Sequence, residues 1–75
     1  MNQVIANPSY TTDEFAAAER ISRSLVYQMW RENWGPDFYY VGNQRRISHE
    51  ARERWRKARE EAAKTREARS AVPAH

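Results

Sequence analysis

The chain has 75 residues, with 13 Lys and Arg, 10 Asp and Glu, a formal net charge of +3 and a mean hydropathy of −1.06. A chain this short buries only about 60% of its unfolded surface, which leaves room for one core and excludes a large enzyme with a deep cleft. It has no cysteine, so disulfides, thiolate zinc sites and cysteine nucleophiles are excluded.

One folded domain is predicted between two disordered ends. Residues 1–9 lack the periodicity of a helix or strand and are interpreted as a flexible N-terminal arm, and residues 70–75 as a disordered tail. Residues 10–69 remain for the domain. No apolar run approaches the roughly 20 residues that cross a bilayer. We therefore expect a cytoplasmic protein with no membrane partner.

Two short helices are predicted at the start of the domain. Thr11, followed three positions later by Glu14, is the capping-box arrangement that begins a helix, which we expect to end near Arg20. Ser22 is the predicted cap of a second helix over residues 23–32. The apolar stripe of this second helix, at helical spacing, consists of Ile21, Val26, Met29 and Trp30.

A small β-hairpin is predicted next. Residues 38–41 form an aromatic and β-branched run that favours a strand. Gly42 and Asn43 then predict a turn, and residues 44–47 a returning strand.

A long helix is predicted after the hairpin, from His49 to about Arg69, with Ser48 as its cap. Trp55 is its main apolar anchor, and only alanines continue the apolar stripe beyond it. We expect the second half of this helix to be held by pairs of opposite charges four residues apart, each worth a few tenths of a kcal/mol.

This order of elements predicts a mainly α fold with a small β-hairpin, the winged helix-turn-helix (α-α-β-β-α). In that fold the second helix enters the DNA major groove and the hairpin, or wing, reaches an adjacent groove or the backbone. Residues 1–40 carry 3 bases and 5 acids, a net of −2, whereas residues 41–75 carry 10 bases and 5 acids, a net of +5. Acidic side chains gather in the first helix, and we expect that helix to face away from the basic side chains.

Polar side chains on the second helix and the wing are the candidate DNA contacts. On the second helix they are Arg23, Ser24, Tyr27, Gln28 and Arg31, and on the wing they are Asn43, Gln44, Arg45 and Arg46. Gln bonds adenine bidentately and Arg does the same to guanine, while hydroxyl groups position phosphates. The alternative is that these side chains are only a solvent-exposed polar surface. For Arg46 the alternative is an ion pair with Glu50.

An ordered set of residues within the range 10–57 carries a family resemblance. A capped helix with an inner Ala is followed by hydrophobic-Ser-Arg, by Val-Tyr, by a glycine at the wing and by an arginine before the last helix. The matching positions are Thr11, Glu14, Ala16, Ile21, Ser22, Arg23, Val26, Tyr27, Gly42 and Arg46. The chain thereby resembles the excisionase and AlpA-type members of the MerR-like winged-helix superfamily. That family usually has an apolar residue and Gly where Glu19 and Arg20 stand, and Gly where Asn33 stands.

The resemblance implies a DNA-binding protein of a mobile genetic element. Most such proteins are recombination directionality factors, which bind and bend attachment-site DNA cooperatively with neighbouring copies and steer a tyrosine integrase toward excision. The AlpA relatives are transcriptional regulators that bind promoters. In both cases we expect no enzymatic activity, catalytic residue, cofactor, metal or small-molecule ligand, and association with the bacterial nucleoid. The alternative of another class is a protein-interaction adaptor that uses Trp34, Tyr39 and the charged last helix.

Overall fold

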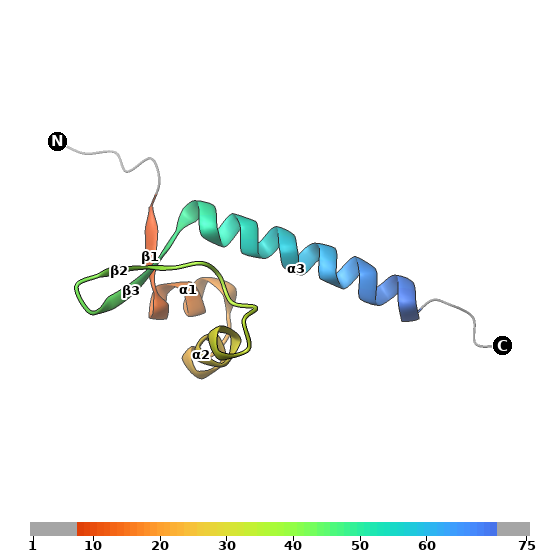
Figure 1. The fold of residues 1–75 in the computed structure, drawn as a ribbon, viewed down its shortest axis with the longest axis horizontal. Coiled ribbons are helices and arrows are strands. Elements are labelled where there is room, and N and C mark those ends of the chain that lie inside the picture. The colour runs from red at the N-terminus through yellow and green to blue at the C-terminus, as the bar shows by residue number, and fades with distance from the viewer. Residues whose placement is uncertain (1–7, 71–75) are drawn as a thin grey trace.

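A computed structural model describes residues 8–70 of the chain, in which three helices accompany a small antiparallel sheet (Figure 1). The elements in chain order are β1 (Ser9–Thr11), α1 (Thr12–Glu19), α2 (Arg23–Arg31), β2 (Tyr39–Val41), β3 (Gln44–Ser48) and α3 (His49–Ser70). The predicted mainly helical composition with a β-hairpin is therefore confirmed.

Hydroxyl side chains begin the helices, as the sequence predicts. The Thr11 hydroxyl accepts from the Glu14 backbone N–H at 3.1 Å, and the Glu14 carboxylate accepts from the Thr11 N–H at 2.9 Å, which completes the capping box of α1. The Ser22 hydroxyl accepts from the Leu25 N–H at 3.0 Å at the start of α2. Each bond satisfies a backbone group that has no partner inside its helix.

Two residues other than glycine close the first two helices in the left-handed region. Arg20 has φ 59° after α1, and Asn33 has φ 66° after α2. At each end the backbone N–H of the residue that follows the left-handed one reaches back into the helix, from Ile21 to the Ala16 carbonyl at 2.9 Å and from Trp34 to the Met29 carbonyl at 3.0 Å. The closure at Arg20 turns the chain sharply between α1 and α2, and the closure at Asn33 turns it into the connection that leads to β2.

The sheet has three strands, in the order β1-β3-β2, where the sequence predicts only two. Strand β1 pairs with β3 through Tyr10 and Ile47, and the Pro8 carbonyl accepts from the His49 N–H at 2.9 Å. Residues 8 and 9 therefore belong to the domain, and the interpretation of residues 1–9 as a flexible arm is wrong for them. Residues 1–7 lie outside the described residues. A strand of three residues is too short for alternation to reveal it.

The core lies between the helices and the sheet. Its fully buried large side chains are Phe15, Val26, Met29 and Ile47. Partly buried residues extend it, and the Phe15 and Trp55 rings meet edge to face with centroids 5.2 Å apart. Trp55 on α3 therefore closes one side of the core, as its predicted role as an anchor requires.

The first half of α3 is fastened to the domain by polar contacts. The Arg52 guanidinium lies 2.6 Å from the Glu19 carboxylate and donates to the Tyr10 hydroxyl at 3.2 Å. The Trp55 indole N–H donates to the Trp34 carbonyl at 2.8 Å. The hydrogen bond to Glu19 raises the pKa of Arg52. These contacts fix the direction in which α3 leaves the domain.

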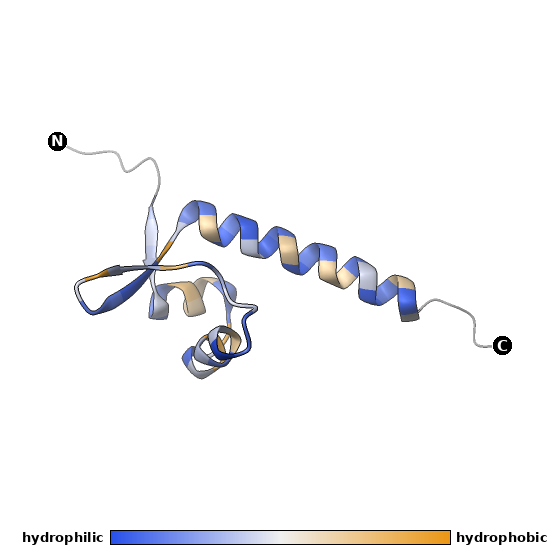
Figure 2. Ribbon diagram, viewed as in Figure 1, coloured by the Kyte–Doolittle hydropathy of each residue, from blue (hydrophilic) through white to orange (hydrophobic). Residues whose placement is uncertain are grey.

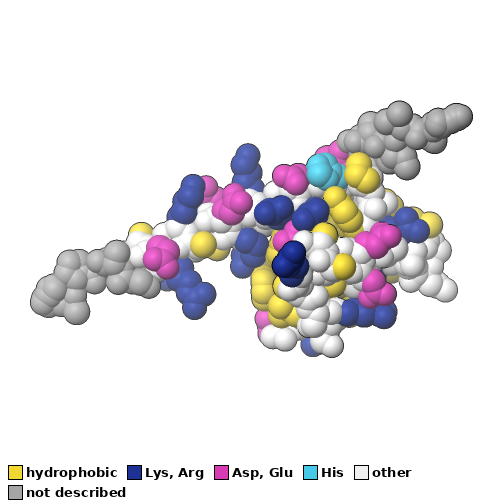
Figure 3. Space-filling view, turned by 180° about the vertical axis from the view of Figure 1, so that it is seen from behind, with side chains coloured by type: hydrophobic (Ala, Val, Ile, Leu, Met, Phe, Trp, Pro, Cys, Tyr) yellow, Lys and Arg dark blue, Asp and Glu magenta, His cyan; other side chains and the backbone are white. Residues whose placement is uncertain are grey.

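The second half of α3 projects beyond the domain (Figure 1). Residues 60–69 are all exposed, and the helix is mostly hydrophilic with short apolar patches (Figure 2). Acidic and basic side chains alternate along it on the face seen in Figure 3. The helix continues through Ser70, so the predicted tail begins later than expected, and residues 71–75 lie outside the described residues. Among the helices of residues 8–70, none combines the length and apolarity needed to cross a membrane.

Candidate nucleic-acid interface

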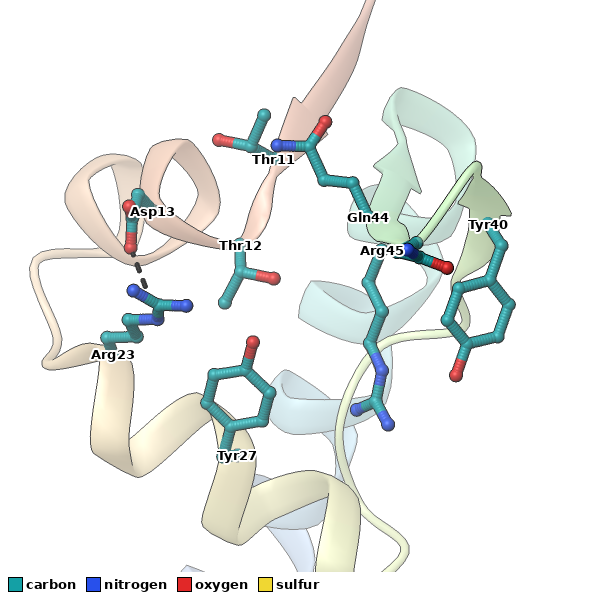
Figure 4. A pocket seen from close by; sticks show the side chains of 9 residues that line it. Thr11, Thr12, Asp13, Arg23, Tyr27, Tyr40, Gln44 and Arg45 are labelled. Atoms are coloured by element: carbon teal, nitrogen blue, oxygen red, sulfur yellow. Dashed lines mark ion pairs between the residues drawn. The ribbon is translucent and has the colours of Figure 1, made fainter.

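A groove opens between the start of α1, the first turns of α2 and the hairpin (Figure 4). Its volume is about 620 Å³. The residues that line it are Thr11, Thr12, Asp13, Arg23, Tyr27, Tyr40, Asn43, Gln44 and Arg45. Five of these nine were predicted as DNA contacts, so the fold brings candidates from α2 and from the hairpin to one surface.

Arg23 and Tyr27 lie one helical turn apart on the wall that α2 contributes. The Arg23 guanidinium lies 5.6 Å from the centre of the Tyr27 ring and 3.6 Å from the Asp13 carboxylate. Hydrogen bonding with Arg23 lowers the pKa of the Tyr27 phenol, and the same bond, helped by the charge of Asp13, raises the pKa of Arg23. The expectation that the acids of the first helix face away from the bases is wrong for Asp13, because the first turn of α1 borders the groove.

Ser24, Gln28 and Arg31 form a second row on α2, beside Arg23 and Tyr27. They are spaced by four and three residues, which places them on one face of the helix, and all three side chains are exposed. The Gln28 amide donates to the Glu32 carboxylate at 3.2 Å, an exposed bond that water or a DNA base can replace. We refer to Ser24, Gln28 and Arg31 as the exposed row of α2.

The hairpin presents its polar side chains on two opposite faces. Ile47 is fully buried, and because side chains alternate along a strand, Arg45 shares its inward face while Gln44 and Arg46 lie on the outer one. The Arg46 guanidinium donates to the Gln44 amide oxygen at 3.0 Å. Asn43 is exposed at the turn, next to Gly42 with φ 62°. The wing candidates are therefore split, with Arg46 facing away from α2.

Arg45 does not extend freely into solvent as a wing arginine would. Its guanidinium lies over the Phe38 and Trp30 rings, 4.5 and 4.7 Å from their centres. The Tyr27 and Tyr40 rings lie at 5.7 and 5.9 Å. In Figure 4 its side chain descends from β3 toward α2 beside Tyr40.

Sequence reasoning did not find Thr11, Thr12, Asp13 or Tyr40 as part of this surface. Thr11 and Asp13 were interpreted only as helix-starting residues, and capping does not reveal what the helix end faces. Tyr40 lies directly across from Arg45 in the ladder between β2 and β3. That pairing follows from a hairpin with Gly42 and Asn43 at its turn, so cross-strand register was the signal that could have identified Tyr40.

No family model, curated protein or solved structure matches this chain. Within residues 8–70, no group of three or more His, Cys, Asp or Glu side chains is placed to hold a metal ion. The chemistry of the groove is that of hydrogen-bond donors, two guanidinium groups and aromatic rings, with one carboxylate at its edge. Such a surface binds anions by charge and planar groups by stacking.

Proposed function

We propose that this chain is a winged helix-turn-helix protein that binds double-stranded DNA, with α2 in the major groove and the β2–β3 hairpin as the wing. The observation that carries the proposal is the groove in which Arg23 and Tyr27 of α2 lie beside Asn43, Gln44 and Arg45 of the hairpin. A helix fits the major groove of B-DNA, and a hairpin next to it lies within reach of the neighbouring backbone or groove.

The connection between α1 and α2 supports this proposal. Only residues 20–22 separate the two helices. Arg20 in the left-handed region ends the first helix, and the Ser22 hydroxyl caps the second. A short turn of this kind is what a helix-turn-helix needs to hold its recognition helix across the end of the preceding helix.

The sheet supports the wing assignment. Strand β3 is central and β2 lies at the edge. The β2–β3 turn extends away from the helices (Figure 1), while Ile47 anchors β3 in the core. Exposed Tyr39 and Val41 on β2 leave this edge accessible. The base of the wing is thus anchored in the core, and its turn is exposed.

The exposed row of α2 is proposed to read base edges. Gln28 matches the N6 and N7 edge of adenine, and Arg31 matches the O6 and N7 edge of guanine. We propose that Ser24 and Arg23, nearer the start of the helix, position phosphates, as do Asn43, Gln44 and Arg46 on the wing. Replacing Gln28 by Ala is expected to cost about 1–3 kcal/mol at one base pair and to relax specificity there.

The test of DNA binding is selection from a randomised duplex library, followed by titration of the enriched duplex and a shuffled duplex at 150 mM NaCl. We expect a conserved motif and an affinity for it at least about 10³-fold tighter than for the shuffled duplex. Lys64→Ala, which removes a positively charged side chain from the projecting part of α3, is the control for Gln28→Ala. It should leave the preference for the selected motif unchanged. Equal affinity for the two duplexes would refute sequence-specific binding.

We further propose that the protein acts as a recombination directionality factor, which promotes excision of a mobile element by a tyrosine integrase, binding and bending attachment-site DNA with neighbouring copies. The support is the ordered resemblance to excisionases over residues 10–57, in which Arg20 and Asn33 adopt the left-handed geometry where that family usually has glycine. The test compares excision of the element and promoter output in a deletion strain. Loss of excision supports this role, and unchanged excision with altered transcription favours an AlpA-type regulator.

A further inference from the structure

The Arg45 guanidinium lies among aromatic rings that come from three different parts of the fold. Tyr27 and Trp30 belong to α2, Tyr40 belongs to β2, and Phe38 lies in the connection between them. All four ring centres lie between 4.5 and 5.9 Å from the guanidinium carbon of Arg45. We call these four rings the aromatic cage.

The rings of the cage also support one another. The Trp30 ring contacts Tyr27 with centroids 5.4 Å apart and Phe38 with centroids 4.9 Å apart, and Phe38 meets Tyr40 at 5.7 Å. The Trp30 indole N–H donates to the Pro36 carbonyl at 2.8 Å. A side chain at Gly35 would place its Cβ 2.5 Å from the Trp30 ring, so the connection passes directly against that ring. The rings of the cage therefore contact one another as well as Arg45.

The register of the hairpin places Arg45 in the cage. Arg45 lies opposite Tyr40 in the ladder and two residues before the buried Ile47. Arg46, its immediate neighbour, points to the other face and bonds Gln44. The two adjacent arginines thus carry the same guanidinium group but lie on opposite faces of β3. Substitution of Arg46 therefore serves as a control for substitution of Arg45.

We propose that Arg45 is a positioning residue that pins the hairpin to α2, so that the two DNA-contacting elements are held at a fixed spacing before DNA arrives. Its guanidinium interacts with ring faces instead of with a phosphate. Contacts between a guanidinium and an aromatic face stabilise by electrostatic attraction, most when solvent is partly excluded. A binding surface that is already ordered loses less conformational entropy on association. The effect of Arg45 on DNA affinity rests on the proposed function, whereas its contact with the rings does not.

The pin itself is tested without DNA, by amide hydrogen exchange in Arg45→Ala, Arg45→Lys and Arg46→Ala. We expect exchange of the β2–β3 hairpin amides to rise about 3- to 30-fold in Arg45→Ala, the range that corresponds to a cation–π contact. Arg45→Lys should restore much of the protection, since an ammonium also interacts with ring faces, and Arg46→Ala should stay within about twofold of the unmodified protein. Unchanged hairpin exchange in Arg45→Ala, or an equal rise in α1 and α3, would overturn the proposal.

The consequence for DNA binding is tested by the dependence of affinity on salt, with the selected duplex as the probe. Each phosphate contact contributes about 0.9 to the slope of log affinity against log salt. Arg45→Ala should weaken binding about 3- to 30-fold with the slope retained, whereas Arg46→Ala should lower the slope by roughly one. A similar loss of slope in Arg45→Ala would make Arg45 a phosphate contact and overturn the positioning role. If no duplex is bound specifically, the proposed function fails while the exchange experiment still decides whether Arg45 pins the hairpin.

Discussion

Replacing Arg20 by Gly is expected to stabilise the protein, because Arg20 closes α1 with φ 59°. A residue with a Cβ in this region pays roughly 1–2 kcal/mol, whereas glycine adopts it without that penalty. Glycine also makes the unfolded chain more flexible, which favours unfolding by about 0.5–1 kcal/mol and opposes that stabilisation. The Arg20 side chain is exposed and makes no ion pair or side-chain hydrogen bond within residues 8–70, so its loss costs little.

The difference between these terms is a stabilisation of about 0.5–1 kcal/mol, or a rise of roughly 2–8 °C in Tm for a domain of this size. The assay is urea denaturation followed by tryptophan fluorescence. Arg20→Ala is the control, because it removes the charge and keeps the left-handed strain, and it should stay within about 0.5 kcal/mol of the unmodified protein. If Arg20→Gly were no more stable than Arg20→Ala, the assignment of strain to Arg20 would be refuted.

Three further predictions concern the groove and the base of α3. Asp13→Asn should raise affinity for the selected duplex about two- to fivefold at low salt, because a charge that repels phosphate is removed; weaker binding in anisotropy titrations would instead mean that Asp13 orients Arg23 for contact. Arg23→Ala should raise the pKa of the Tyr27 phenol toward its ordinary value, since the guanidinium that favours the phenolate is lost; a spectrophotometric titration with an unchanged midpoint would contradict this. Glu19→Gln should destabilise the domain by about 1–3 kcal/mol in urea denaturation, because the Arg52 side chain that it contacts at 2.6 Å is only 15% exposed; an unchanged midpoint would show that the pair contributes nothing.

Features that depend on neighbours along the chain were predictable from the sequence. The capping box at Thr11 and the cap at Ser22 each depend on a bond to a residue three positions away. The hairpin follows from a glycine and an asparagine between two strand-forming runs, and its turn lies at the predicted residues 42 and 43. In these cases the interaction that defines the structure lies within the same short stretch of sequence.

Features that depend on distant residues were not predictable. Strand β1 exists because Tyr10 pairs with Ile47, and no pattern in three residues indicates that partner. The Arg52 side chain bonds to Tyr10 across 42 positions of sequence. The sequence predicts Arg45 as a wing residue but does not reveal the rings around its guanidinium, because they come from α2 and from the connection after it. A side chain's charge is visible in a sequence, but the groups that it contacts depend on tertiary packing.

The projection of α3 has a consequence for spectroscopic measurements of folding. Residues 60–69 contribute helical peptide units to circular dichroism at 222 nm, yet no tryptophan lies among them, and all three tryptophans lie between residues 30 and 55. An exposed helix end unwinds gradually, independently of the cooperative loss of the core. Ellipticity will therefore decline at temperatures where tryptophan emission is still native. For this protein, two melting curves that do not coincide report a fraying helix end and a two-state core, and not a folding intermediate.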